Sequence, residues 1–128
     1  MFLPHKSDNG AILAWEYLPG AAGSYVTGQL VKVTAGKVSA ITADTTTTPP
    51  YLCMATITLP EGELLPVTRV SDEMQYGTTL AADAAAAVVG GKLQVASGGL
   101  QAKTGAGTFE IVSLEGTTEG SVVIGRWA

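Results

Sequence analysis

The sequence predicts an all-β protein that forms a single compact β-barrel or β-sandwich, with an N-terminal arm and at most one short helix. Two hairpin patterns, in residues 28–40 and 91–103, each place a tight turn between runs that alternate apolar and polar side chains. Sixteen glycines are spread through the 128 residues, as many short strands joined by tight turns require. The spacing of the turn signals predicts about seven to ten strands.

The first hairpin turns at Ala35-Gly36. This turn places Val33 opposite Val38 and Val31 opposite Ala40, while lysine, threonine and serine side chains fall on the other face. Such alternation is typical of a strand pair with one buried face.

The second hairpin turns at Gly98-Gly99, a pair that accepts positive φ at both central positions of a two-residue loop. In this register Ser97 faces Leu100, and Val95 faces Ala102. The hairpin positions that we expect in the core are Val31, Val33, Val38, Leu93 and Val95.

The two hairpins resemble each other. GQLVKVTAGKVSA in residues 28–40 aligns with GKLQVASGGLQA in residues 91–102 across a one-residue gap. A duplicated three-stranded unit explains the likeness. Chance convergence also explains it, because hairpins draw on a narrow set of turn residues.

The remaining segments divide the chain into residues 1–24, an N-terminal arm with the strand that follows it, and residues 25–128, the β domain. Residues 1–10 mix proline with polar residues and predict an irregular arm. Residues 11–18 fit a strand or a short helix, because an apolar run of this length is ambiguous. The only other helix candidate, residues 81–89, is two turns at most.

Proline interrupts one strand pattern. Residues 64–70 alternate like a strand but contain Pro66, which has no N–H to donate to a neighbouring strand. The proline therefore predicts an edge strand or the start of a strand.

Composition excludes several classes of partner. The formal net charge is −4, and no basic run is present, so we expect no nucleic-acid partner. The least polar stretch, residues 81–91, is too short to span a membrane and contains Asp83. Charged residues make up only 14% and hydrophobic residues 46%, which favours burial of surface against copies of the same chain.

Reactive side chains are few and scattered. His5 is the only histidine and lies in the predicted arm. Cys53 is the only cysteine, so it cannot form an internal disulfide and is expected to be a buried apolar side chain in a protein made in a reducing compartment. The acidic residues sit in separate turns without the spacing of a metal site. We therefore expect no enzyme activity, no metal and no cofactor.

Large aromatic residues lie near both ends of the sequence. Trp15 and Tyr17 follow the arm, and Trp127 is the penultimate residue. They fit two roles: plugging the ends of a barrel or docking on a partner, since such residues dominate binding hot spots. The residues that we predict to bind a partner are Phe2, Leu3, His5, Trp15 and Tyr17.

The chain resembles the small decoration, or cement, proteins of tailed-bacteriophage capsids. The resemblance is carried by residues 25–31 (YVTGQLV), 48–51 (TPPY), 62–70 (GELLPVTRV), 89–95 (VGGKLQV), 109–112 (FEIV) and 120–124 (GSVVI). It implies a β-rich virion protein, made in the host cytoplasm, that binds the major capsid protein on the outer surface of the head. It also implies a trimer that stabilises the lattice, without cofactor or catalysis. The alternative is a carbohydrate- or host-surface-binding β module, in which exposed aromatic rings stack on sugars.

Overall fold

The computed structural model describes residues 1–10 and 13–127, and this part of the chain is all-β, as predicted. Its strands form three antiparallel sheets and no helix. They number thirteen rather than seven to ten, because several are only three residues long. In chain order they are β1 (Leu3–Ser7), β2 (Trp15–Pro19), β3 (Gly23–Tyr25), β4 (Leu30–Thr34), β5 (Lys37–Ala40), β6 (Tyr51–Cys53), β7 (Ile57–Leu59), β8 (Leu64–Arg69), β9 (Met74–Thr79), β10 (Lys92–Val95), β11 (Ala102–Thr104), β12 (Phe109–Leu114) and β13 (Val122–Trp127).

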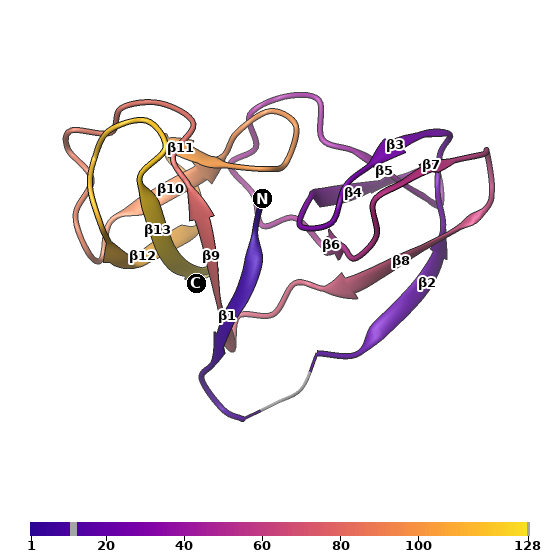
Figure 1. Ribbon diagram of the computed structural model, residues 1–128, viewed down its shortest axis with the longest axis horizontal. Coiled ribbons are helices and arrows are strands. Elements are labelled where there is room, and N and C mark those ends of the chain that lie inside the picture. The colour runs from indigo at the N-terminus through magenta and orange to yellow at the C-terminus, as the bar shows by residue number, and fades with distance from the viewer. Residues whose placement is uncertain (11–12, 128) are drawn as a thin grey trace.

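The strands gather into two halves (Figure 1). The first half is a five-stranded sheet in the order β2-β8-β6-β4-β5, with the small β3-β7 pair beside it. The second half has the order β9-β13-β12-β10-β11, and β1 is added outside β9. A parallel bridge closes each five-stranded sheet on itself, Gly20 with Val38 in the first half and Leu80 with Ala102 in the second.

The two halves have the same connectivity. β2, β4, β5, β6 and β8 correspond in order and pairing to β9, β10, β11, β12 and β13. The registers agree as well, because Tyr51 pairs with Arg69 where Phe109 pairs with Trp127. The hydrogen bonds that close the sheets also match: Ala21 N–H donates to Val38 O and Ala81 N–H to Ala102 O, both at 2.8 Å.

The turn before the last strand of each half repeats too. Residues 60–63 read PEGE and residues 118–121 read TEGS, with Gly62 at φ 79° and Gly120 at φ 85°. In each turn the N–H of the fourth residue donates to the carbonyl oxygen of the first residue, at 3.2 Å from Glu63 to Pro60 and at 3.0 Å from Ser121 to Thr118. This agreement over five strands favours a duplicated unit over convergence of two hairpins.

The first predicted hairpin is confirmed, with Val33 paired to Val38 and Val31 to Ala40. Ala35 and Gly36 both have positive φ, 51° and 78°, as this two-residue turn requires. The predicted burial of Val33 is wrong, since its side chain is 48% exposed. The neighbouring strand β6 pairs only as far as the start of β4, so the end of the hairpin extends beyond the sheet that would cover it.

The second hairpin has the predicted register but a different turn. Val95 pairs with Ala102 as expected. However, Gly99 N–H donates to Ala96 O at 3.0 Å, and Ser97 N–H donates to Asp44 rather than across to Leu100. The loop is thus wider than two residues. It is displaced because Gly99 reaches the first half, where its carbonyl oxygen accepts the N–H of Leu30 at 2.8 Å.

Each half has a buried cluster, and the cluster of the second half extends into the first half. The cluster of the first half contains Tyr25, Val31, Val38, Cys53, Leu59, Leu65 and Val67. The cluster of the second half includes Tyr76, Leu93, Val95, Phe109, Ile111, Val123 and Trp127. It also contains Leu30 and Leu52, which belong to β4 and β6 of the first half. Leu30 and Leu52 alternate with Val31 and Cys53 of the first cluster, so the opposite face of the first sheet is covered by the second half.

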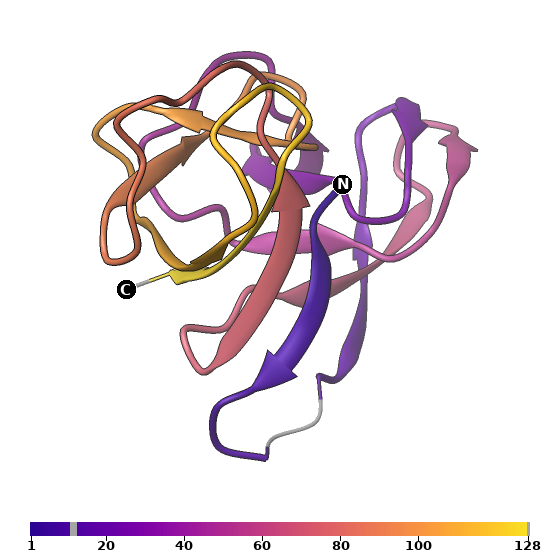
Figure 2. The same ribbon diagram turned by 60° about the vertical axis from the view of Figure 1, so that its left-hand side comes forward.

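The predicted irregular arm of residues 1–10 is wrong. Residues Leu3–Ser7 form β1, which runs alongside β9 (Figure 2), and Phe2 is fully buried. The segment lacks an alternating pattern because a bulge lies between Pro4 and Lys6, and its strand character comes from the β9 edge that it pairs with.

The two ambiguous segments are also settled. Residues Trp15–Pro19 form strand β2 rather than a helix, while Ala11 and Ile12, the predicted start of that strand, lie outside the described residues. The helix candidate 81–89 consists of turns. Ala84 N–H donates to Thr117 O at 2.7 Å, a contact with another loop that a segment too short to sustain a helix readily makes.

Pro66 lies in β8, between β2 and β6, so the predicted edge position is wrong. The missing N–H is tolerated because β6 ends at Cys53, opposite Val67, so the regular ladder stops just before the position where residue 66 would donate to it. Of the two hydrogen bonds that could join Met54 and Pro66, only one forms, in which Met54 N–H donates to Pro66 O at 3.0 Å.

Candidate partner-binding surface

The structure separates the five predicted partner-binding residues. Phe2 lies in the core, with its ring 5.6 Å from the rings of both Phe109 and Trp127. Its N–H donates to Gly28 O at 2.8 Å, which holds the start of the chain against the first half. Phe2 therefore cannot be a surface anchor. Trp127 is also buried, so it belongs to the core and is not a surface anchor.

Leu3 and His5 are exposed on β1. They line a shallow groove with Gly77 and Thr79 of β9 and Val122 of β13. Leu3 is 47% exposed, so this groove presents apolar surface.

Trp15 and Tyr17 are exposed on β2, by 53% and 59%. Their spacing of two places them on one face of the strand, whereas Leu18 packs against the core of the first half. Residues opposite them on β8 extend the apolar surface: Pro66 faces Tyr17, and Leu64 is 57% exposed opposite the end of β2. We call Trp15, Tyr17, Leu64 and Pro66 the aromatic strip.

β2 is also an edge strand. It pairs with β8 on one side, and on its other side the only bridge in the described part of the chain is that of Gly20 to Val38 of β5, just beyond the end of β2. The carbonyl oxygen of Pro66 points to β6, so Pro66 makes no ladder bond to β2. Tyr17, directly opposite, therefore directs its own N–H and C=O outward, because these groups share one side in an antiparallel strand. We call the outer side of residues 15–18, before the Gly20 bridge to β5, the free edge.

Beside the free edge lies a polar site made by Glu16, Tyr51 and Arg69. Arg69 Nε is 4.0 Å from Glu16 Oε2, and the guanidinium lies 5.9 Å from the centre of the Tyr51 ring. The side chain of Arg69 is 73% exposed, so the ion pair is solvated and weak. We call these three residues the mouth of the first half.

The corresponding positions in the second half are occupied differently. By strand register, Glu16, Tyr51 and Arg69 correspond to Tyr76, Phe109 and Trp127. Those three aromatic side chains are buried, with Phe2 packed on Phe109 and Trp127 and with Tyr76 packed on Trp127, whereas Arg69 in the mouth of the first half is exposed to solvent.

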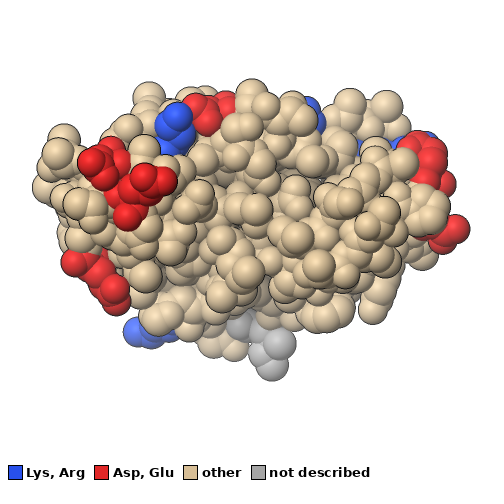
Figure 3. Space-filling model, turned by 45° about the horizontal axis from the view of Figure 1, so that its top comes forward, with Lys and Arg blue, Asp and Glu red and all other residues tan. Residues whose placement is uncertain are grey.

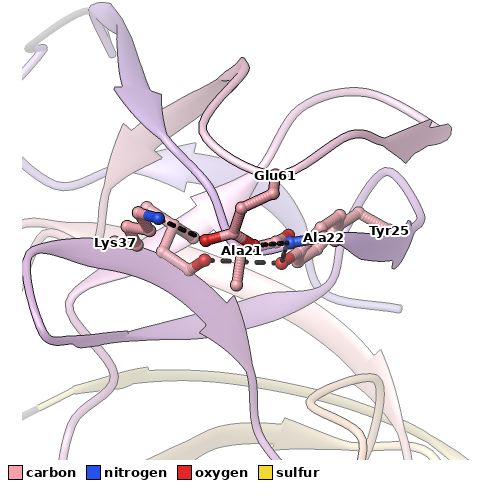
Figure 4. A network of polar contacts seen from close by, with 6 residues as sticks. Ala21, Ala22, Tyr25, Lys37 and Glu61 are labelled. Carbon is pink, nitrogen blue, oxygen red and sulfur yellow. Dashed lines mark hydrogen bonds and ion pairs between the residues drawn. The ribbon is translucent and has the colours of Figure 1, made fainter.

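A polar network holds the closing end of the first half together (Figure 4). Glu61 pairs with Lys37 and accepts the N–H of Ala22 at 2.8 Å, while the Tyr25 hydroxyl donates to Ala21 O at 2.7 Å. The hydrogen bond from Lys37, aided by that from Ala22, lowers the pKa of Glu61. Burial raises the pKa of Tyr25. These contacts join the turn before β8 to β5, and they were not predicted because the partners come from segments far apart in the sequence.

Among the described residues, the remaining reactive side chains show no sign of a metal site. Cys53 is buried, its thiol donates to Ala55 O at 3.1 Å, and burial raises its pKa. Within residues 1–10 and 13–127, no three histidine, cysteine or acidic side chains are grouped as a metal site would require. The same residues form no helix long and apolar enough to cross a membrane.

One face of the molecule carries little charge. Figure 3 shows a broad central area without lysine, arginine, aspartate or glutamate, and the charged side chains lie mostly toward the two ends. Such a surface suits contact with protein better than contact with nucleic acid.

Sequence reasoning identified Trp15 and Tyr17 but not the features around them. Their alternation in WEYLP was a signal that both rings share a face. The free edge and the mouth depend on which strand pairs with β2, and pairing is not visible in a local pattern. A scan against protein-family models and a search of curated proteins both find no match to this chain.

Proposed function

We propose that this protein is a structural virion protein that binds the outer surface of a bacteriophage capsid and stabilises the head lattice. The observation that carries the proposal is the exposed aromatic strip beside an unpaired sheet edge. The Glu61 network, by contrast, makes hydrogen bonds within the fold itself. The resemblance of the sequence to capsid decoration proteins supplies the kind of partner, the major capsid protein.

The experiment is a binding assay on phage heads that lack the protein. We expect the purified chain to sediment with expanded heads and to raise the temperature at which they release DNA. Heads in their unexpanded form are the control surface. Equal release temperatures with and without bound protein would contradict a stabilising role, and no sedimentation would contradict attachment.

The proposal includes self-association, with a trimer implied by the resemblance. Leu3 and Val122 of the β1 groove, and Val88 and Val89 of the 81–91 loop, are exposed apolar residues outside the aromatic strip. Burial of such surface against copies favours assembly. Mass photometry of the free protein and of protein released from heads measures the state. A monomer in both samples would contradict the trimer.

The second candidate is a carbohydrate- or host-surface-binding module. It is favoured by the exposure of Trp15 and Tyr17, because flat aromatic rings stack on sugar faces. A glycan array separates the two proposals. Binding of a sugar that is lost in Trp15→Ala while attachment to heads persists would support this alternative.

A further inference from the structure

We propose that the free edge of β2 binds an extended segment of the partner protein, which adds to the sheet as a strand and places an aromatic side chain in the mouth of the first half. The inference rests on the proposed function, because the partner it names is the capsid subunit. It is drawn from the internal repeat, since the second half has the equivalent edge occupied.

The occupant of the equivalent edge is β1. It pairs antiparallel with the outer side of β9, where Leu3 lies opposite Gly77. The residue of the first half that corresponds to Gly77 is Tyr17, in the middle of the free edge. The second half thus has an added strand at this position, and the first half leaves the same position open.

The free edge is suited to receive a strand. Tyr17 directs its N–H and C=O outward, and an added strand would satisfy them, as in other cases of β-augmentation. Edges that must stay unpaired commonly carry lysine, proline or a bulge, whereas the outward-directed residues of the free edge are Trp15 and Tyr17, with a regular register to β8, and proline comes only at position 19, where the strand ends. The large rings add apolar contact on one face of the incoming strand.

The mouth indicates the side chain that the segment brings. In the second half, Phe2 precedes the added strand, and its ring lies 5.6 Å from the rings of Phe109 and Trp127. The first half has Tyr51 and Arg69 at those two positions. An aromatic ring entering there would meet the Tyr51 ring and the Arg69 guanidinium, which attracts the face of an aromatic ring.

The test compares two substitutions of one residue. Tyr17→Pro removes the outward N–H and obstructs an incoming strand, yet it leaves the pairing with β8 intact, because Tyr17 makes no ladder bond to Pro66. Tyr17→Thr removes the ring and keeps the N–H. We expect Tyr17→Pro to weaken binding to phage heads at least about tenfold, and Tyr17→Thr to weaken it clearly less.

A second measurement does not depend on any variant. Deuterium uptake of the wild-type segment Trp15–Pro19 is compared between free protein and protein bound to heads. Separately, thermal melts of the two variants confirm that both fold. We expect slower exchange in the bound state. Equal losses from the two substitutions, or unchanged exchange while wild-type protein binds, would overturn the strand addition and leave the proposed function standing. Failure of wild-type protein to bind heads would overturn both.

Discussion

At the scale of single residues, two adjacent glycines have different roles. Gly98 and Gly99 both have positive φ, 95° and 73°. A Cβ on Gly98 would meet no atom within 4 Å, whereas a Cβ on Gly99 would collide with the backbone of Leu30. Gly98 serves only the turn, and Gly99 allows the hairpin of the second half to touch the first half.

We therefore predict unequal costs for two alanine substitutions. Gly98→Ala should lower the free energy of unfolding by about 1–2 kcal/mol, the cost of a left-handed backbone for an L-residue. Gly99→Ala should lower it by more than about 3 kcal/mol, because the Leu30 backbone has to move as well. Urea unfolding followed by circular dichroism measures both, and equal costs would contradict the close approach.

Glu61 gives a prediction about pH. Its pKa in the folded protein lies below the ordinary value of 4.5, chiefly because Lys37 donates a hydrogen bond to it. The stabilisation is therefore complete above that ordinary value and is lost as the pH falls through the lowered folded pKa. Glu61→Gln should lower the melting temperature at neutral pH but leave it close to wild type in strong acid.

Glu63→Gln is the matched control for that experiment. Glu63 lies on the same turn and takes no part in the network of Figure 4. We expect a smaller change in melting temperature at neutral pH than for Glu61→Gln. A difference between Glu61→Gln and wild type that does not depend on pH would show that the ion pair with Lys37 is not its source.

At the scale of elements, β1 belongs to the fold and not to a free arm. Removal of β1 would uncover the edge of β9, and removal of Phe2 just before it would uncover the rings of Phe109 and Trp127. We predict that Phe2→Ala costs about 3–5 kcal/mol of unfolding free energy. Leu3→Ala, whose side chain is 47% exposed, should cost less than about 1 kcal/mol. Thermal denaturation compares the two, and a small effect of Phe2→Ala would contradict the role of this ring as a cover for Phe109 and Trp127.

Some of these elements could be predicted from the sequence and others could not. Local alternation predicted both hairpins and the shared face of Trp15 and Tyr17, because these features depend on neighbours in the chain, but it left open whether that face is buried or exposed. β1 was missed because its strand character depends on β9, about seventy residues away. The burial of Val33 was mispredicted for a similar reason, since it depends on where the distant strand β6 ends. Trp15 and Tyr17 of the candidate site were predicted, but the free edge was not. Whether a strand lies at the edge of a sheet depends on the pairing of distant segments, which a local pattern does not show.

At the scale of the whole molecule, the repeated halves are not independent units. Leu52 belongs to β6 of the first sheet, yet its side chain lies in the cluster of the second half with Tyr76 and Trp127. Leu30 of β4 does the same, and its N–H is bonded to Gly99 of the second half. Opening either half would expose apolar surface of the other, so we expect one cooperative unfolding transition.

Two probes can follow the two halves separately. Labelling of the buried thiol of Cys53 reports the first core, and fluorescence of Trp127 in a Trp15→Phe background reports the second. We predict coincident urea midpoints for both probes. Leu52→Ala should shift both by the same amount, corresponding to about 2–5 kcal/mol, because this side chain joins the halves. A shift in Trp127 fluorescence without an equal shift in Cys53 labelling would show that the halves unfold one at a time and that the duplicated unit keeps the stability of a separate domain.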